Sequence, residues 1–195
     1  MTAEPHASTR QRIVTAAVDL TSESGWSAVT MSRLAERVGV SRQTVYNEVG
    51  SKPLLAEAVI ADELSRFTEA IHVAFDQNEG NPVSALREAS YSVLMRAEKS
   101  DFLRSIVNAT QGVDTELLPA LTTRSSLVVE GASAAVLARL TPMLPEMGSD
   151  RIVALTDVIV RTVLSHVMQP SGTAEQTADT VAWLATACLA AATPQ

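Results

Sequence analysis

The sequence predicts an all-α protein of about nine helices, in which an N-terminal three-helix domain with a helix-turn-helix joins a larger helical domain. Apolar residues recur three and four positions apart, first at Ile13, Ala16, Ala17 and Leu20. Residues that favour helix N-caps precede most of these stretches. No segment alternates between apolar and polar residues with period two, so strands are not expected.

The N-terminal part contains four expected helices, at residues 9–24, 31–38, 42–48 and 52–77. Each follows a residue whose side-chain oxygen can accept a hydrogen bond from the first turn: Ser8, Thr30, Ser41 and Ser51. Ser8 with Gln11 also has the spacing of a capping box. Gly25 and Gly39 stand at the expected helix ends.

The remainder contains five expected helices, at 82–99, 101–111, 117–140, 150–168 and 174–192. Asn81-Pro82 places an N-cap before a proline at the first helical position, and Thr173 with Gln176 forms another capping box. We therefore expect a mobile tail at 1–7, a helix-turn-helix domain at 8–51 and a helical domain at 52–195.

Composition and motifs exclude several functional classes. The single cysteine, Cys188, excludes a disulfide framework and fits a reducing cytoplasm. Residues 1–8 lack the apolar segment of a secretion signal, and 181–192 is too short to span a bilayer, so we expect a cytoplasmic protein without a membrane partner. Glycine-rich nucleotide loops, G-x-S-x-G and H-E-x-x-H are all missing, and the three histidines have no metal-type spacing. We expect no catalytic residue, no metal site, no cofactor and no enzymatic activity.

Charge is distributed unevenly along the chain. The net charge is −7, but residues 1–53 hold six basic and five acidic side chains, whereas the remainder holds nine and seventeen. A near-neutral N-terminal part followed by an acidic remainder indicates two parts of the chain that bind different partners. The alternative is that the acidic surface only maintains solubility.

The sharpest motif lies between Thr30 and Leu55. A short amphipathic helix ends at Gly39-Val40, and Ser41 then caps a second short helix, which is the spacing of a helix-turn-helix. The outward side of the second helix carries hydrogen-bonding side chains of the kind that contact bases and phosphates: Arg42, Gln43, Thr44, Tyr46 and Asn47. Two helices joined by a glycine turn also occur in proteins that never bind DNA, so the motif alone leaves both alternatives open.

This segment resembles the DNA-binding domain of the tetracycline-repressor (TetR) family of transcriptional regulators. The resemblance covers residues 9–60 and is carried by Ile13, Ala16-Ala17, Gly25, Thr30, Leu34-Ala35, Gly39-Val40-Ser41, Thr44-Val45-Tyr46, Gly50-Ser51-Lys52 and Leu55. It implies that Thr30, Tyr46 and Lys52 contact phosphates of a double-stranded DNA operator. It also implies that Arg42, Gln43 and Thr44 begin the recognition helix and face bases or backbone.

Three positions depart from the family pattern. Val49 replaces the usual aromatic residue after the recognition helix, so this corner should pack with less volume. Glu48 places a carboxylate near phosphates and should therefore point aside or contact a cytosine amine. Pro53 replaces an acidic residue and is tolerated in a first helical turn.

The resemblance also implies that the last two helices pair with a second copy of the chain in a homodimer. Their candidate interface residues form two apolar stripes: Leu155, Ile159, Val163 and His166, then Val181, Leu184 and Cys188. The alternative is that both stripes pack within one chain.

By the same resemblance, the middle helices should enclose a ligand. The candidate wall residues are aliphatic or aromatic, with a few polar groups: Tyr91, Leu94, Met95, Phe102, Ile106, Asn108, Gln111, Arg124, Leu127 and Glu130. The alternative for the polar ones is a solvated helix face. Because aromatic residues are only 4% of the chain, we expect a small hydrophobic ligand such as a fatty-acyl compound.

Together these inferences predict a ligand-responsive repressor that binds a palindromic operator as a homodimer. The alternatives are a helical small-molecule-binding protein that has lost operator binding, and an enzyme in the helical pocket. A gel shift with the DNA upstream of its own coding sequence distinguishes the repressor from the first alternative. The second alternative lacks support, because the sequence contains no catalytic constellation.

Overall fold

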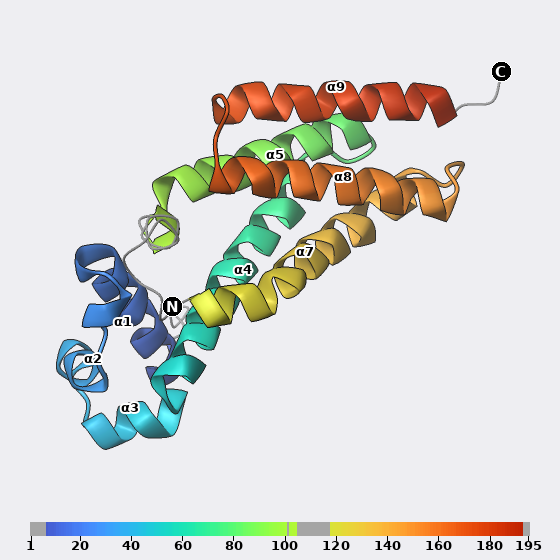
Figure 1. Cartoon of the computed structure of the whole chain (residues 1–195). Helices are drawn as coiled ribbons and strands as arrows, with labels where there is room; N and C mark the ends of the chain where they lie inside the picture. Colours follow the sequence, from blue (N-terminus) through green and yellow to red (C-terminus); the bar gives the residue numbers. More distant parts are fainter. Residues whose placement is uncertain (1–6, 101, 105–117, 193–195) are drawn as a thin grey trace, which may run out of the picture. The chain divides into compact units, whose positions relative to one another are not determined.

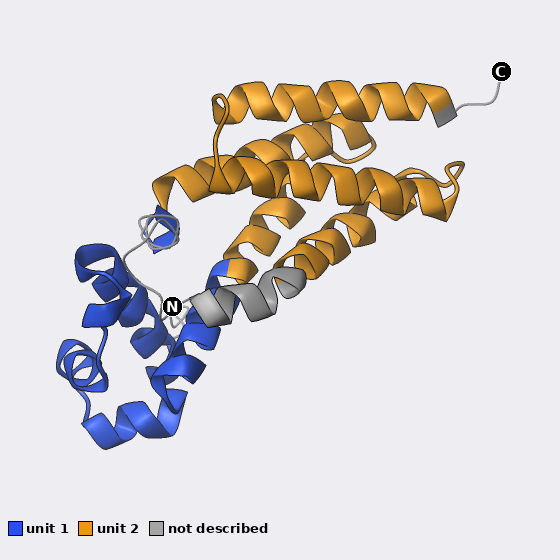
Figure 2. Ribbon diagram, in the orientation of Figure 1, with its two compact units in different colours: residues 1–63, 101–124 blue, residues 64–100, 125–195 orange. Residues whose placement is uncertain are grey.

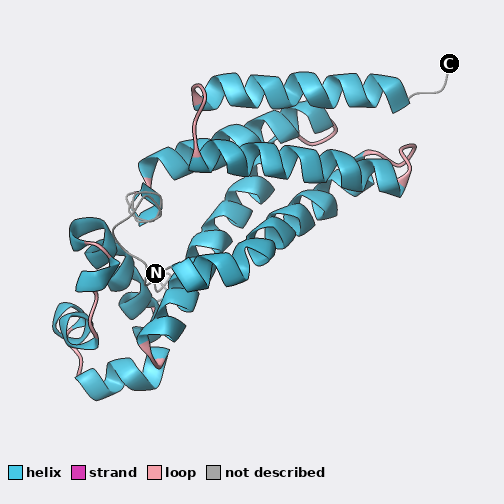
Figure 3. Cartoon of the chain, viewed as in Figure 1, coloured by secondary structure: helices cyan, strands magenta, loops and turns pink. Residues whose placement is uncertain are grey.

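The computed structural model describes residues 7–100, 102–104 and 118–192, and the regular secondary structure in these ranges is entirely helical (Figures 1 and 3). This confirms the predicted all-α fold class. The expected helix at 101–111 falls outside the described residues except for 102–104, which are helical.

The chain divides into two compact units (Figure 2). Unit 1 comprises residues 1–63 and 101–124, and unit 2 comprises 64–100 and 125–195. The division falls inside α4 (Lys52–Gln77), whereas the sequence places the domain boundary before this helix. The first turns of α4 belong to unit 1 because three of their side chains are buried in its core: Leu55, Ala56 and Val59.

Unit 1 contains α1 (Thr9–Ser24), a 3-10 turn (Trp26–Ala28), α2 (Met31–Val38), α3 (Arg42–Val49) and the start of α4. Three predicted N-caps are present in this unit. The side chains of Ser8, Thr30 and Ser41 accept hydrogen bonds from the backbone N–H of Gln11, Arg33 and Thr44, respectively. These caps satisfy donors that the first helical turn leaves without backbone partners, so they fix where each helix begins.

Unit 2 contains the rest of α4, α5 (Pro82–Lys99), most of α7 (Leu118–Leu140), a 3-10 turn (Thr141–Met143), α8 (Ser149–Met168) and α9 (Ala174–Ala192). The Asn81 side chain accepts from the Ser84 N–H at 3.0 Å, ahead of Pro82. Thr173 and Gln176 form the predicted capping box, with hydrogen bonds of 3.2 and 3.0 Å.

The core of unit 2 is mainly aliphatic, and α5 packs against both α8 and α9. At the surface, the Arg87 Nε atom on α5 donates to Asp179 Oδ1 on α9 at 2.7 Å. Arg139 on α7 pairs with Asp76 on α4. Because such exposed ion pairs contribute little, the buried aliphatic side chains provide most of the stability of this unit.

One polar group in this core lacks a partner. Thr156 on α8 is 0% exposed, and its Oγ1 atom makes no hydrogen bond with the described part of the chain. We predict that Thr156→Val, which replaces this hydroxyl with a methyl, raises the free energy of unfolding by about 1 kcal/mol. Urea unfolding followed by circular dichroism measures the change.

Thr21→Val is the matched control for this substitution. Thr21 is equally buried, but its hydroxyl donates to the Ala17 carbonyl at 2.7 Å. The control should therefore gain no stability. An unchanged or lower free energy of unfolding in Thr156→Val would contradict the assignment of an unsatisfied hydroxyl.

Candidate nucleic-acid interface

The turn between α2 and α3 sets the angle of the helix-turn-helix. Gly39 adopts the left-handed conformation, with φ 74° and ψ 39°, which favours glycine. The Ala35 carbonyl accepts from both Gly39 and Val40 N–H, at 2.9 and 3.0 Å. Val45 on α3 is fully buried in the core of unit 1, together with Val38 of α2. The turn conformation and this packing together hold α3 at a fixed angle to α2.

Two arginines of α1 bind the C-terminal ends of the helix-turn-helix helices. The Arg12 Nη2 atom donates to the Val38 carbonyl at 2.5 Å, at the end of α2. Arg10 donates to the Glu48 carbonyl, near the end of α3. Both carbonyls belong to last helical turns, which lack intrahelical donors and carry partial negative charge. The sequence does not indicate this role because the two arginines are far in sequence from the carbonyls they bind.

The predicted DNA-contacting side chains of α3 differ in exposure. Arg42, Gln43, Tyr46 and Asn47 are exposed, whereas Thr44 is half-buried. The hydroxyls of Thr44 and Ser41 are hydrogen-bonded at 2.8 Å, so Thr44 belongs to the N-cap as well as to the outer surface. The exposed four therefore form the main polar surface of this helix.

The exposed α3 side chains are paired along the helix. The Arg42 guanidinium lies 5.5 Å from the centroid of the Tyr46 ring, and its Nη2 donates to the phenolic oxygen at 3.3 Å. The Gln43 Nε2 atom donates to Asn47 Oδ1 at 3.0 Å. Such contacts four residues apart restrict the rotamers of long side chains and so preorganise the surface.

Lys52 and Thr30 lie at helix starts in the same unit. Lys52 begins α4, and its Nζ atom lies 5.6 Å from the centroid of the buried Trp26 ring. This cation–π contact directs the ammonium group while leaving the side chain partly exposed. Thr30 is exposed and uses its hydroxyl to cap α2. Each position combines a polar side chain with the N–H groups of a helix start, which favours anions.

Another arginine of unit 1 is occupied by an acidic partner. Arg37 donates to both carboxylate oxygens of Glu23, at 2.9 and 2.5 Å, which ties α2 to α1. These hydrogen bonds lower the pKa of the Glu23 carboxyl group. The Arg37 guanidinium is therefore already bound to a carboxylate of its own unit.

The corner after α3 contains Val49, at which the sequence predicts packing with less volume. Val49 is buried, and a surface hollow of about 420 Å³ lies beside it. The hollow is lined by Arg10, Glu48, Val49, Gly50, Leu54, Glu57, Ala58 and Ala61. Gly50 has a positive φ of 71°, and a Cβ atom there would lie 2.7 Å from Leu54 Cδ1. A residue other than glycine at position 50 would therefore be strained.

The residues predicted to bind a ligand are only partly brought together. Leu94 is buried in the core of unit 2, with Tyr91 and Met95 packed against the same core. Glu130 is exposed, so it provides no buried charge. The remaining polar and aliphatic candidates lie outside the described part of the structure: Ile106, Asn108, Gln111 and the side chains of Arg124 and Leu127.

Phe102 requires a correction. This side chain is 2% exposed and packs in the core of unit 1, among residues of the helix-turn-helix and α4. It therefore does not share the unit 2 core with Tyr91 and Leu94. The sequence alone does not indicate this position because Phe102 is separated by some forty residues from its neighbours on α4.

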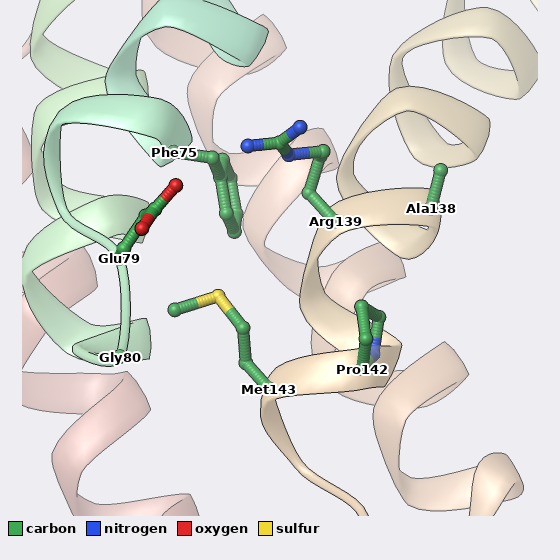
Figure 4. A pocket seen from close by; sticks show the side chains of 7 residues that line it. All are labelled: Phe75, Glu79, Gly80, Ala138, Arg139, Pro142 and Met143. Carbon is green, nitrogen blue, oxygen red and sulfur yellow. The ribbon is translucent and has the colours of Figure 1, made fainter.

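A hollow of about 210 Å³ is present in unit 2 (Figure 4). It lies between the end of α4 and the end of α7 and is lined by Phe75, Glu79, Gly80, Ala138, Arg139, Pro142 and Met143. None of these residues was predicted, since they come from two segments far apart in sequence. The volume is below the roughly 300–1,000 Å³ of typical ligand pockets, so this hollow by itself does not account for a long ligand.

The predicted dimer residues also require a correction. Four of the seven lie in the core of unit 2 and are inaccessible to a second chain: Leu155, Ile159, Val163 and Val181. Leu184, His166 and Cys188 are half-buried. The His166 ring makes two hydrogen bonds within its own chain, to the Thr162 carbonyl at 2.8 Å and the Ser171 hydroxyl at 3.0 Å.

Different residues of α8 and α9 present apolar side chains to solvent. Trp183 on α9 is 71% exposed, and Val153 and Val158 on α8 are 52% and 48% exposed. Each helix is thus apolar on an inner face that packs within the chain and partly apolar on an outer face. The helical period of apolar residues indicates the inner stripe first, because that stripe is the more continuous of the two.

No cluster of three potential metal ligands is present among the described residues. Within the same part of the chain, no helix combines the length and apolar character needed to cross a membrane.

Two family models of tetracycline-repressor-type regulators match most of the chain. The family "Bacterial regulatory proteins, tetR family" matches residues 13–59, and "Bacterial Tetracyclin repressor, C-terminal domain" matches residues 81–187. The HTH-type transcriptional regulator AlkX of Mycobacterium tuberculosis is 32% identical over 169 residues, which cover 83% of this chain and 75% of the relative.

Solved structures show the same fold. The TetR family repressor AlkX from Dietzia sp. strain DQ12-45-1b, implicated in biodegradation of n-alkanes, has a TM-score of 0.73 at 23% identity. That match covers 94% of this chain and 98% of the other. A transcriptional regulator from Rhodococcus sp. RHA1 has a TM-score of 0.65 at 16% identity, covering 94% and 97%.

Proposed function

The chain belongs to the TetR family of DNA-binding transcriptional regulators, and we propose that it is a repressor that binds a palindromic operator as a homodimer and is released by a hydrophobic small molecule. The observation that carries the DNA-binding part is the exposed polar face of α3, held by packing and by the Arg10 and Arg12 hydrogen bonds. An exposed, rigid, polar helix face is what entry into a DNA major groove requires.

Phosphate contacts from the start of α4 and from α3 itself would position the recognition helix on the DNA. Lys52 carries a positive charge at the start of α4, and Tyr46 presents a phenolic hydroxyl on the recognition helix. Contacts of this kind are independent of sequence and release counterions from the duplex. They fix the orientation of α3, and the side chains on its outer face then contact the base edges.

We predict that Lys52→Ala weakens binding to all DNA sequences and reduces the slope of log K against log salt concentration by about 0.9 per subunit. Tyr46→Phe should weaken binding to all sequences alike without removing a charge. Fluorescence anisotropy at several salt concentrations measures both effects. Lys99→Ala is the matched control, since Lys99 is an exposed lysine of unit 2. Unchanged affinity and salt slope in Lys52→Ala would contradict the proposed docking.

The homodimer is proposed to form through the outer faces of α8 and α9. Large exposed apolar side chains are unfavourable in water, and Trp183 is the most exposed of them. Tryptophan is also among the residues that contribute most to protein interfaces. A dimer would present two copies of α3, which must be about 34–36 Å apart to enter successive major grooves.

We predict that Trp183→Glu produces a monomer at micromolar concentration, because burying the new carboxylate in the interface carries a large desolvation cost. Sedimentation velocity measures the change against a dimeric wild type. Val73→Glu is the control, since Val73 is an exposed valine that belongs to α4 and to neither α8 nor α9. A monomeric wild type, or a dimer that tolerates Trp183→Glu, would contradict this interface.

The ligand is proposed to be aliphatic, in keeping with two observations. A relative bearing the AlkX name is implicated in the biodegradation of n-alkanes. In the described part of this chain, the aromatic side chains in the core of unit 2 are Phe75 and Tyr91, and most of the others are aliphatic. An extended hydrocarbon needs only length and apolar walls, whereas a planar aromatic ligand favours aromatic stacking partners. Such a ligand would release DNA to the extent that it prefers the non-binding conformation.

We predict that fatty acids and their esters or thioesters release the protein from DNA with a potency that rises with chain length. Burial of each methylene contributes about 0.8 kcal/mol, or roughly fourfold in the concentration needed, until the pocket is filled. A competition anisotropy assay with a C6 to C18 series measures this dependence. No release by any aliphatic compound, together with release by a planar aromatic one, would contradict the proposal.

A further inference from the structure

The exposed face of α3 consists of two parallel stripes with different chemistry. One stripe is the Arg42–Tyr46 pair and the other is the Gln43–Asn47 pair. Successive residues of an α-helix lie 100° apart, and residues four apart share a face, so the two pairs run side by side along the helix. Each stripe therefore presents a separate set of donors and acceptors.

The Arg42–Tyr46 stripe presents hydrogen-bond donors. The Arg42 guanidinium stacks on the Tyr46 ring, and its Nη2 donates to the phenolic oxygen at 3.3 Å. The remaining guanidinium N–H groups and the phenolic O–H are then left as donors for an acceptor on the DNA. A cation beside a hydroxyl donor matches a phosphate oxygen.

The Gln43–Asn47 stripe presents a donor next to an acceptor. One Nε2 hydrogen of Gln43 is used in the bond to Asn47 Oδ1, at 3.0 Å. The second Nε2 hydrogen and the Oε1 carbonyl of the same amide remain for another partner. Asn47 thereby restricts the rotation of a long side chain that is otherwise free to turn in solvent.

This pattern matches one base in the major groove. Adenine presents the N7 acceptor beside the N6 amino donor, which is the complement of the Gln43 amide. Guanine presents two acceptors, N7 and O6, so the Gln43 carbonyl would face a like group. Cytosine offers an amino donor without an adjacent acceptor, and thymine offers the O4 acceptor beside a methyl group.

We propose that Gln43 recognises an adenine in each half-site and that Asn47 is a positioning residue that holds the Gln43 amide in the orientation that recognises it. The inference rests on the proposed function, because it requires α3 to enter the major groove. It adds the identity of one base, the residue that contacts it and the residue that orients the contact.

The test begins with selection of preferred half-sites by the wild-type protein from a random duplex library. Binding of single-base variants is then measured for wild type, Gln43→Ala and Asn47→Ala. We expect one adenine position at which Gln43→Ala lowers the preference for adenine over guanine by about ten- to a hundredfold. Asn47→Ala should lower the preference severalfold at that same position, and 7-deazaadenine there should weaken wild type but not Gln43→Ala.

Asn47→Asp distinguishes positioning from a merely structural effect. The carboxylate keeps an acceptor for Gln43 Nε2, so the adenine preference should be retained although its charge lowers affinity for every sequence. Arg42→Ala is the control from the other stripe. It should weaken all base variants equally and reduce the salt slope.

Three results would overturn the inference. Gln43→Ala and Asn47→Ala could alter different base positions, which would make Asn47 a separate contact. Asn47→Ala could leave every base preference unchanged, or the shared position could prefer a base other than adenine. A wild-type protein that selects a half-site but gives any of these results leaves the proposed function intact, whereas a protein that binds no DNA overturns both.

Discussion

The fixed orientation of α3 is the constraint on which the DNA-binding surface depends. This helix spans only Arg42–Val49, and an isolated helix of that length is unstable in water. Its conformation therefore depends on packing and capping: its Val45 and Val49 side chains are buried in the core of unit 1, and Ser41 caps its first turn. The Arg10 hydrogen bond to the Glu48 carbonyl then anchors its last turn to α1. Without these contacts the two polar stripes on its outer face would have no defined direction.

Features that depend on nearby residues could be predicted from the sequence. The N-caps at Ser8, Thr30 and Ser41 each involve a bond to an N–H three residues later, so side-chain type and spacing are sufficient to identify them. The helix-turn-helix is equally local, since its turn depends on Gly39 and its two helices bury Leu34, Ala35, Val38 and Val45. This explains why both the fold class and the recognition helix follow from the sequence.

Features that depend on packing between distant segments could not be predicted in the same way. Helices α8 and α9 have apolar residues on two faces, and periodicity does not indicate which face packs within the chain. Val163 and Val181 proved to be internal, while Trp183 is exposed. Three features join segments that are far apart in sequence: the Arg12 hydrogen bond to Val38, the position of Phe102 in unit 1, and the hollow lined by Phe75 and Met143.

The central claim is that two copies of α3 bind successive major grooves on one face of the operator. Hydroxyl-radical footprinting on a selected operator tests it most directly, because cleavage reports protection of each backbone position. The account predicts two protected segments related by two-fold symmetry, with centres about 34–36 Å apart along the duplex. A single protected segment, or two segments on opposite faces of the DNA, would contradict it.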